Sequence, residues 1–423
     1  MKKGFTLVEV LAIIAVLGII LITVVPNIGG SIEKKKEEEY KKIINLIENA
    51  AKTYYSYNND IMSVGVDELL KEDLITTDLI NPITNEKISG CVNVTTDEDG
   101  IKQFIFSDKC NVLLSTHIEN LYNTAASENG LVKDDTDDEN IRYAGSNEVV
   151  KNYVSFDGDV WRIIGIVDGK VKLVKNDSIG TYSWDSSTSG FNNGMGYNIW
   201  ETIDGKTKAD GTTKSDLNIL LNEGYYGGTY PSTCYGGQNN ATKPCPTIFM
   251  SNKLKQMVDE SAVWYLAAQT QSNPSISPYG LPTLDSYNNE RGDSVLGSYK
   301  NIAKTEWTGA VGLIYPSDYG YASIDSECRV NLRAGLVNNN GKIDYTNAKC
   351  KNQNWLFKKD AWYRTISPIL SWDGLYCAVA YGNINTTDNY IPSSIFPSVY
   401  LKSNVIVVDG IGTSDDPYIL KLL

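Results

Sequence analysis

The chain has 423 residues and a formal net charge of −13. This length allows two or three domains, and the acidic balance disfavours nucleic acid as the main partner, because phosphate binding needs a basic surface. The single histidine, His117, argues against a histidine base and against a zinc site with two histidine ligands. The composition has 27 Tyr against 8 Phe, which suits loop-rich β structure with aromatic rings near its surface.

The first feature along the chain is an apolar segment, residues 5–25, in which only Thr6, Glu9 and Thr23 are appreciably polar. As a helix it would be about 30 Å long, enough to cross the hydrocarbon core of a membrane. A secretory signal peptide is disfavoured, because the apolar run is too long and continues through Pro26 into a charged helical stretch. A plain membrane anchor leaves Glu9 unexplained, since a carboxylate inside hydrocarbon costs about 2–3 kcal/mol or more.

The hexapeptide GFTLVE at residues 4–9 resembles the processing site of type IV prepilins and type II secretion pseudopilins. A short basic leader ends in Gly4, Phe5 follows, and Glu9 would be the fifth residue of the mature chain. The resemblance implies that a prepilin peptidase, a membrane-embedded aspartyl peptidase, cuts between Gly4 and Phe5 and methylates the new amino terminus. Residues 1–4 are then a leader.

Two further residues are expected to act in assembly. Glu9 of one subunit can neutralise the α-amino group of Phe5 on a neighbouring subunit, which would set the stagger between packed helices. Pro26 lacks an N–H, so it either kinks the helix or ends it, and the two alternatives carry equal weight. Residues 5–26 are predicted to form a transmembrane and assembly helix.

Residues 27–110 are predicted to form a pilin-like amphipathic helix and a small β head. Apolar residues recur near helical spacing and should pack on that head: Ile32, Tyr40, Ile43, Ile44, Ile47, Ala51, Tyr54 and Tyr55. A short helix is expected over 66–74, and two alternating segments, 87–95 and 101–107, flank an acidic turn that indicates a hairpin.

Seven cysteines occur without a C-x-x-C pair, which leaves out a zinc ribbon or a thioredoxin-like motif. Their spacing suggests three local disulfides, with Cys377 left over: Cys91–Cys110, Cys234–Cys245 and Cys328–Cys350. Disulfides are natural in an exported protein, and reduced buried thiols are the alternative.

Residues 111–150 are predicted to be a helix followed by an acidic linker, because residues 134–139 read DDTDDE. A calcium loop is the alternative for this run. The EF-hand spacing is absent, since Gly at position 6 and Glu at position 12 are both missing.

Residues 151–423 are predicted to be mainly β, with a strand pair over 159–167 and 171–174 and helical pieces near 215–221 and 251–256. The region resembles large uncharacterised exported proteins of Gram-positive gut bacteria, and its pattern is similar to that of C-type-lectin-like domains. Four stretches carry the resemblance: residues 140–143, 161–165, 312–322, and the ending from Tyr400 to Tyr418. The whole chain is then α+β: a long pilin helix on a small antiparallel sheet, followed by a large mainly-β domain.

No phosphate loop, nucleophile elbow or zinc-protease motif occurs, so we expect no enzyme, no cofactor and no metal. Arg291-Gly292-Asp293 is an adhesion-like tripeptide that chance explains more simply.

The first hypothesis for function is a minor pilin or pseudopilin. It would span the cell membrane once, bind other subunits through its N-terminal helix and display residues 151–423 on the surface, in a pilus or a secretion or competence pseudopilus. The alternatives are an adhesin for a carbohydrate or another cell-surface ligand, and a tethered enzyme.

Overall fold

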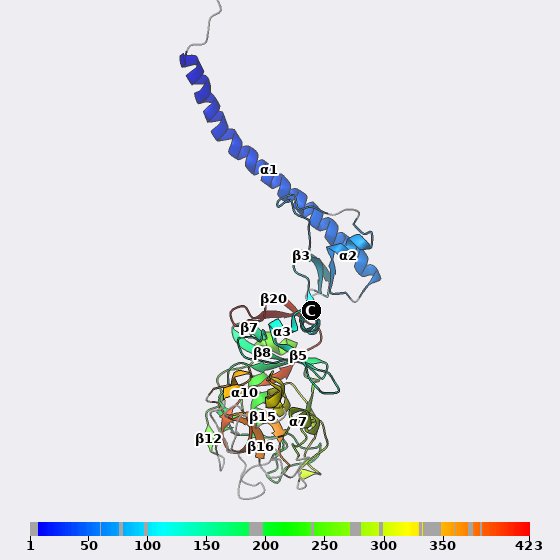
Figure 1. The fold of residues 1–423 in the computed structure, drawn as a ribbon, viewed down its shortest axis with the longest axis vertical. Coiled ribbons are helices and arrows are strands. Elements are labelled where there is room, and N and C mark those ends of the chain that lie inside the picture. Colours follow the sequence, from blue (N-terminus) through cyan, green and yellow to red (C-terminus); the bar gives the residue numbers. More distant parts are fainter. Residues whose placement is uncertain are drawn as a thin grey trace, which may run out of the picture. The chain divides into compact units, whose positions relative to one another are not determined.

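The computed structural model describes the backbone of residues 7–59, 61–75, 79–96, 100–185, 198–237, 241–270, 281–295, 299–329, 332, 348–359, 361–370, 375–380 and 383–423. Within these ranges side chains are described from residue 32 on, except at 96, 348, 349, 375–377 and 380. The chain forms two compact units (Figure 1). Residues 1–112, with Leu423, make the first unit, and residues 113–422 make the second.

The first unit is built on one long helix, α1 (Leu7–Tyr57). Its first half is apolar and its second half is rich in Glu and Lys, both good helix formers. The helix continues through Pro26, so the alternative that a helix ends there is wrong. Among the residues whose side chains are described, no helix is both long and apolar enough to cross a membrane. The predicted transmembrane segment, residues 5–26, lies outside that set.

A small antiparallel sheet packs on the second half of α1. It consists of β1 (Ser63–Gly65), β2 (Cys91–Thr96) and β3 (Lys102–Ser107) in that order, with α2 (Val66–Lys71) between β1 and β2. The predicted hairpin is therefore present as β2 and β3, and the predicted helix over 66–74 is present as α2.

The core of this head forms where the amphipathic face of α1 meets the sheet. Ile47 and Ala51 of α1 are fully buried against Leu69 and Val92. The apolar residues predicted to face the head do so from Tyr40 onward. Ile32 is the exception: 51% of its surface is exposed, because it lies on α1 before the first contact with the head.

The second unit contains two larger sheets. The first has the strand order β19-β9-β8-β7-β21-β20, and β6 also pairs with β8 and with β5. Its strands are β5 (Leu131–Lys133), β6 (Ile141–Tyr143), β7 (Tyr153–Phe156), β8 (Asp159–Val167), β9 (Lys170–Lys175), β19 (Ser398–Tyr400), β20 (Val405–Asp409) and β21 (Tyr418–Leu422), and β4 (Val112–Leu113) lies where the chain enters the unit.

The second sheet has the order β10-β18-β15-β16-β17. Its strands are β10 (Thr181–Tyr182), β15 (Tyr363–Pro368), β16 (Leu375–Ala380), β17 (Asn383–Asp388) and β18 (Ser393–Ser394). Two small pairs stand apart from it: β11 (Cys234–Tyr235) with β12 (Thr242–Lys243), and β13 (Val263–Tyr265) with β14 (Glu306–Thr308).

Short helices lie between the strands of this unit, which is mixed but mainly β. They are α3 (Leu114–Asn129), α5 (Asp216–Ile219) running into the π-helix η1 (Leu220–Tyr226), α6 (Asn252–Met257), α7 (Thr283–Glu290), α8 (Pro316–Tyr321), α9 (Ser326–Arg329) and α10 (Ala348–Asn352). A continuous apolar core joins the sheets, with Trp161, Trp264 and Ile366 fully buried in it.

Of the helix and acidic linker predicted over 111–150, the helix is present as α3, but the acidic run that follows is part of the second unit and not a linker. Helix α3 and strands β5 and β6 belong to the second unit, and β6 pairs with β8 in the first sheet. Asp134 and Thr136 of the acidic run are buried, because Asp134 forms an ion pair inside the unit. The large domain therefore starts at residue 113 and not at 151.

A glycine allows β6 to lie so close to β8. Gly165 has φ +156°, and a Cβ added there would stand 2.1 Å from the carbonyl oxygen of Ile141 and 3.0 Å from the Cα of Arg142. The pairing of β8 with β9 also shifts between Ile163 and Gly165. A β-bulge with glycine at the point of close approach allows β6 to pair with β8, which already pairs with β7 and β9.

Candidate functional site

The structure positions the predicted assembly signal only in part. Gly4 and Phe5 lie outside the described residues, so the predicted cleavage site has no described geometry. Glu9 and Pro26 lie within α1, and their side chains lie outside the described set. The described part of the signal is therefore the continuous helix that carries both residues.

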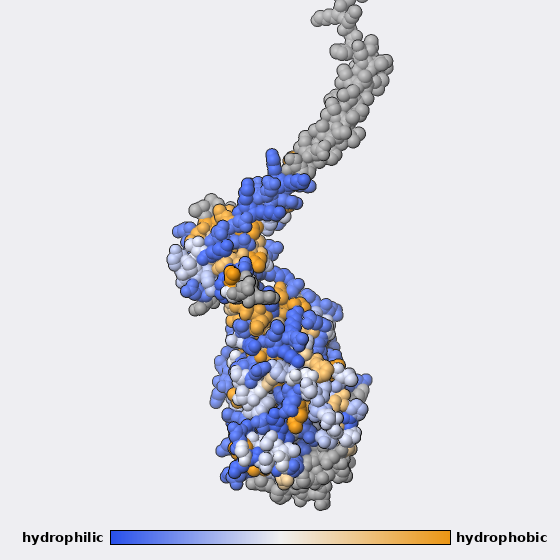
Figure 2. All heavy atoms as spheres, turned by 180° about the vertical axis from the view of Figure 1, so that it is seen from behind, coloured by the Kyte–Doolittle hydropathy of each residue, from blue (hydrophilic) through white to orange (hydrophobic). Residues whose placement is uncertain are grey.

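The junction of α1 with its head is described in full. Residues 32–39 of α1 are all exposed and mostly charged, and Figure 2 shows hydrophilic residues along this stretch. Contact with the head begins at Tyr40. Farther along, Glu48 Oε1 accepts the backbone N–H of Phe106 at 3.0 Å, and the ring of Tyr55 stands edge-on to Phe104 at 5.4 Å. Among the described side chains of α1, those that contact the head thus lie from Tyr40 onward.

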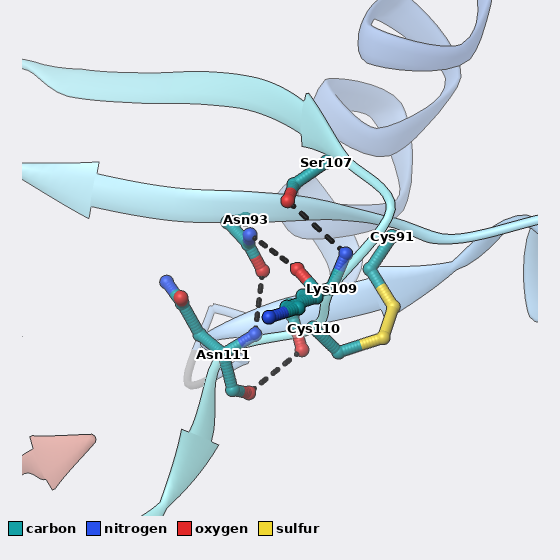
Figure 3. Close-up of a disulfide and its surroundings, with 7 residues drawn as sticks. Cys91, Asn93, Ser107, Lys109, Cys110 and Asn111 are labelled. Atoms are coloured by element: carbon teal, nitrogen blue, oxygen red, sulfur yellow. Dashed lines mark hydrogen bonds between the residues drawn. A yellow bond between two sulfur atoms is a disulfide. The ribbon is translucent and has the colours of Figure 1, made fainter. Parts of the chain in front are cut away.

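A disulfide and one asparagine fasten the end of the hairpin (Figure 3). Cys91 and Cys110 are bonded, with 5.2 Å between their Cα atoms. Asn93 of β2 is nearly buried; its Nδ2 donates to the carbonyl of Lys109 at 3.0 Å, and its Oδ1 accepts the N–H of Asn111 at 2.7 Å. The segment after β3 is therefore tied back onto β2. Sequence reasoning missed Asn93, although a polar amide inside an alternating strand was the available signal.

The other two disulfides join segments that the spacing had also paired. Cys234–Cys245 closes the loop around β11 and β12, and Cys328–Cys350 joins α9 to α10. These are the three pairs that the sequence predicted. Cys377 lies in β16, and its side chain is outside the described set.

A chain of buried charges crosses the second unit. Arg142 of β6 donates from Nε to Asp134 at 2.9 Å and from Nη1 to Asp318 at 2.7 Å, and Lys172 of β9 donates to the other oxygen of Asp318 at 2.6 Å. All four side chains are at most 1% exposed. The two positive charges are matched by two negative charges, which offsets the free-energy cost of removing them from water.

Asp318 holds this chain of charges to helix α8. Its Oδ2 also accepts the N–H of Tyr315 at 2.9 Å, at the start of α8. Burial alone would raise the pKa of Asp318, but Lys172 and Arg142 outweigh burial and lower that pKa below its ordinary value. The ammonium of Lys172 lies 3.9 Å from the ring centre of Tyr315 and about 5 Å from those of Trp264 and Tyr400. Asp318 is therefore ionised, and it connects Arg142 and Lys172 to the start of α8.

A second set of charges lies beside the first. Arg291, at the end of α7, donates Nη2 to both oxygens of Asp168, at 2.8 and 2.7 Å. Its neighbour Glu290 is fully buried and accepts the N–H of Ser317 at 3.0 Å and the Oγ–H of Ser317 at 2.5 Å. The side chain of Arg291 in the adhesion-like tripeptide is only 14% exposed and pairs with Asp168, which does not suit a free adhesion loop.

The buried carboxylates of these clusters accept hydrogen bonds from donors of the protein itself. The carboxylate of Asp134 accepts hydrogen bonds from Thr136, Asn140 and Arg142, so protein donors fill the position proposed for calcium. Within the described ranges, no group of three acidic, histidine or cysteine side chains could hold a metal. His117 packs edge-on against the ring of Tyr418 at 5.2 Å, and burial lowers its pKa. Sequence reasoning did not find the clusters, although Arg142 and Lys172 inside apolar strands were a signal.

The tryptophans mostly belong to the core. Those at 161, 184, 200, 264, 307 and 355 are buried, Trp362 is 36% exposed, and Trp372 lies outside the described residues. A small hollow lies beside Trp184 and Trp200, whose ring centres are 5.1 Å apart. Another hollow lies between the start of η1 and the loop at Cys234.

Comparison with known proteins gives one partial match. Over 73 residues the chain is 37% identical to the type II secretion system core protein G of Aeromonas hydrophila, which covers 17% of this chain and 51% of that protein. The chain thus spans about half the length of the curated relative it matches. No family model and no solved structure matches. The partial similarity supports a pilin-like role and no finer assignment.

Proposed function

We propose that this chain is a minor pilin or pseudopilin that enters a surface filament, or a secretion or competence pseudopilus, through α1. One observation carries the proposal: a 51-residue helix whose second half packs on a small antiparallel head while residues 32–39 stay exposed. The partial similarity to a type II secretion core protein supports it. Other pilin subunits and a membrane are the partners that this proposal implies.

The helix has two separate tasks in this proposal. A prepilin peptidase cuts between Gly4 and Phe5, and residues 5–26 remain in the cell membrane until assembly. Glu9 then pairs with the α-amino group of Phe5 on a neighbouring subunit, because neither charge is tolerated alone among packed apolar helices. The second unit is displayed outside the cell, and its size favours a low-copy or tip subunit over one that packs along the shaft.

The processing step is tested by co-expressing the chain with a prepilin peptidase and sequencing the amino terminus of the product. We expect a mature chain that starts at Phe5 and carries a methyl group on its amine. A Gly4→Val variant, which keeps the apolar helix intact, should remain uncut. A mature start at any other residue would remove the processing site from the proposal.

The role of Glu9 is tested separately, with the variant Glu9→Leu. Cleavage should continue, since the cut lies five residues earlier, while incorporation into filaments should fall strongly because the Phe5 amine loses its partner. Glu33→Leu, an exposed position on the same helix, is the matched control and should assemble normally. Normal incorporation of Glu9→Leu in sheared filament fractions would contradict the proposed pairing.

A further inference from the structure

A run of charges lies on α1 between its apolar segment and the first contacts with the head. Residues 33–42 read EKKKEEEYKK, and all of the lysines and glutamates among them are exposed. Figure 2 shows this stretch as hydrophilic surface. Within the part of the chain whose side chains are described, no residue of this run forms an ion pair. The run is therefore a charged helix surface without an opposite charge in contact in the same chain.

The charges form two lines along the side of α1 that faces away from the head. Residues spaced four and then three positions apart lie above one another on a helix. Each line has a positive, a negative and a positive charge in turn: Lys35, Glu39 and Lys42 in one, and Lys34, Glu38 and Lys41 in the other. The residues that pack on the head, such as Ile43 and Ile47, recur on the opposite side of the helix.

A second, parallel copy of α1 matches these charges only when it is shifted along the helix axis. With no shift, each lysine meets a lysine and each glutamate meets a glutamate, and a shift of seven residues sets Lys34 against Lys41. A shift of three or four residues, about 4.5–6 Å, brings opposite charges level. For a shift of four there is one like pair, Glu33 with Glu37, and the opposite pairs are Lys34–Glu38, Lys35–Glu39, Glu37–Lys41 and Glu38–Lys42.

We propose that the charged run of α1 pairs with the same run on a second copy of this chain, in parallel and shifted by four residues. The inference rests on the proposed function, in which Glu9 of one subunit meets the amine of Phe5 on its neighbour. That contact requires the same shift of four residues, although it lies about 25 residues earlier in the helix. An exposed ion pair adds little affinity, but a wrong shift replaces attraction by repulsion, so the run selects the register. Two adjacent copies are enough for this contact.

The pairing is tested by co-expressing two differently tagged full-length chains and capturing one through the tag of the other after the membranes are solubilised in mild detergent. An acidic variant carries Lys34→Glu and Lys35→Glu. A basic variant carries Glu38→Lys and Glu39→Lys. Each variant should capture itself about tenfold less than the unaltered chain does, because attractive pairs become repulsive. The acidic and basic variants together should recover the capture of the unaltered chain, because their charges are again opposite.

The mixture of variants separates contact between copies from contact within one helix. In each variant chain the altered residues face like charges four positions away in the same helix, so pairing within the helix predicts that the mixture is no better than either variant alone. That result would overturn the proposal, as would an unaltered chain that does not capture itself. The matched control carries Glu119→Lys and Glu128→Lys, two exposed changes on α3 with the net charge of the basic variant, and should capture itself normally.

Disulfide formation in the membrane then measures the shift. A chain with Lys35→Cys should become joined to one with Glu39→Cys, since a disulfide needs Cα atoms within about 7 Å. Two chains that both carry Lys35→Cys should not exceed the background of the unaltered chain, and a stronger bond between these two would overturn the shift. The proposed function fails separately: a chain cut at Phe5 without recovery in the mixture loses only the pairing, and an uncut chain with recovery loses only the processing.

Discussion

Glu290 is a buried acid whose surroundings set its charge. It is fully buried, and burial raises its pKa to about 7, although Arg291 and the donors of Ser317 act in the opposite direction. An unfolded glutamate titrates near 4.5, so between that value and about 7 the folded chain binds more protons than the unfolded chain. The stability that Glu290 contributes is therefore complete below pH 4.5 and is lost as pH rises through about 7.

The variant Glu290→Gln tests this linkage. Glutamine copies the protonated acid, so the decline in the unfolding free energy between pH 5 and pH 8 should become smaller, by up to about 3 kcal/mol. Urea unfolding at a series of pH values measures this change. Glu128→Gln, on an exposed part of α3, is the control and should leave the profile unchanged. A Glu290→Gln profile parallel to that of the unaltered chain would show that Glu290 is ionised throughout.

Asp318 is the residue on which the chain of buried charges depends. Asp318→Asn would leave Arg142 and Lys172 buried with one carboxylate, so we expect a loss of about 3–5 kcal/mol in the free energy of unfolding. Adding Lys172→Met should recover part of that loss, because the cation without a partner is removed. The exposed Asp293→Asn is the control in the same urea titrations. If the single and double variants were equally unstable, the ion pair would not be the cause.

At the scale of elements, the close approach of β6 to β8 positions Arg142. The carbonyl of Ile141 occupies the space where any other residue at 165 would place its Cβ, and Arg142 is the next residue along β6. The bulge in β8 thus decides whether the guanidinium of Arg142 reaches Asp318. The backbone contact between Gly165 and Ile141 therefore controls the ion pair between Arg142 and Asp318.

Gly165→Ala should push β6 away from β8. Overpacking of this kind costs about 1–3 kcal/mol, and the loss of the Arg142 contacts adds to it. Hydrogen exchange should become faster at the amides of β6 while the amides of the second sheet keep their protection. Gly169→Ala, at φ +73° with open space around its Cβ, is the matched control for backbone strain alone. Equal exchange rates of β6 in both variants would show that the close approach carries no such role.

At the scale of the whole molecule, the two units have separate cores. The core of the first unit is formed by α1, α2 and β2, while that of the second extends over both of its larger sheets. Each unit also carries its own disulfides, with Cys91–Cys110 in the first and the other two in the second. Separate cores allow separate unfolding transitions.

Replacing Cys91 and Cys110 by serine should therefore destabilise the first unit alone. Opening a loop of this length costs about 3 kcal/mol in the chain-entropy description. In calorimetry we expect one transition to move to lower temperature and the other to stay in place. Replacing Cys328 and Cys350 by serine is the reciprocal control and should move the other transition. A joint shift of both transitions would show that the units unfold together.

The predictions that succeeded concern residues close in sequence. The continuation of the helix beyond residue 26, the hairpin of β2 and β3 and the strand pair of β8 and β9 follow from periodicity and turn chemistry, which act over a few residues. The local disulfide pairs follow from short loops. Where the structure differed, at the acidic run over 134–139, contacts with residues far along the chain outweighed the local preference for solvent. Tyr287 donates to Asp138 over a separation of 149 residues, and Tyr321 donates to Asp135 over 186.

The sequence by itself determined the long helix and its small head, because an amphipathic stripe needs only one surface to cover it. Only the tertiary structure decided that residues 113–150 complete the second unit, and that Asp318 serves both Arg142, 176 residues away, and Lys172, 146 residues away. With 51 acidic residues in the chain, composition cannot select which one meets a given cation; only the folded backbone brings one of them within reach.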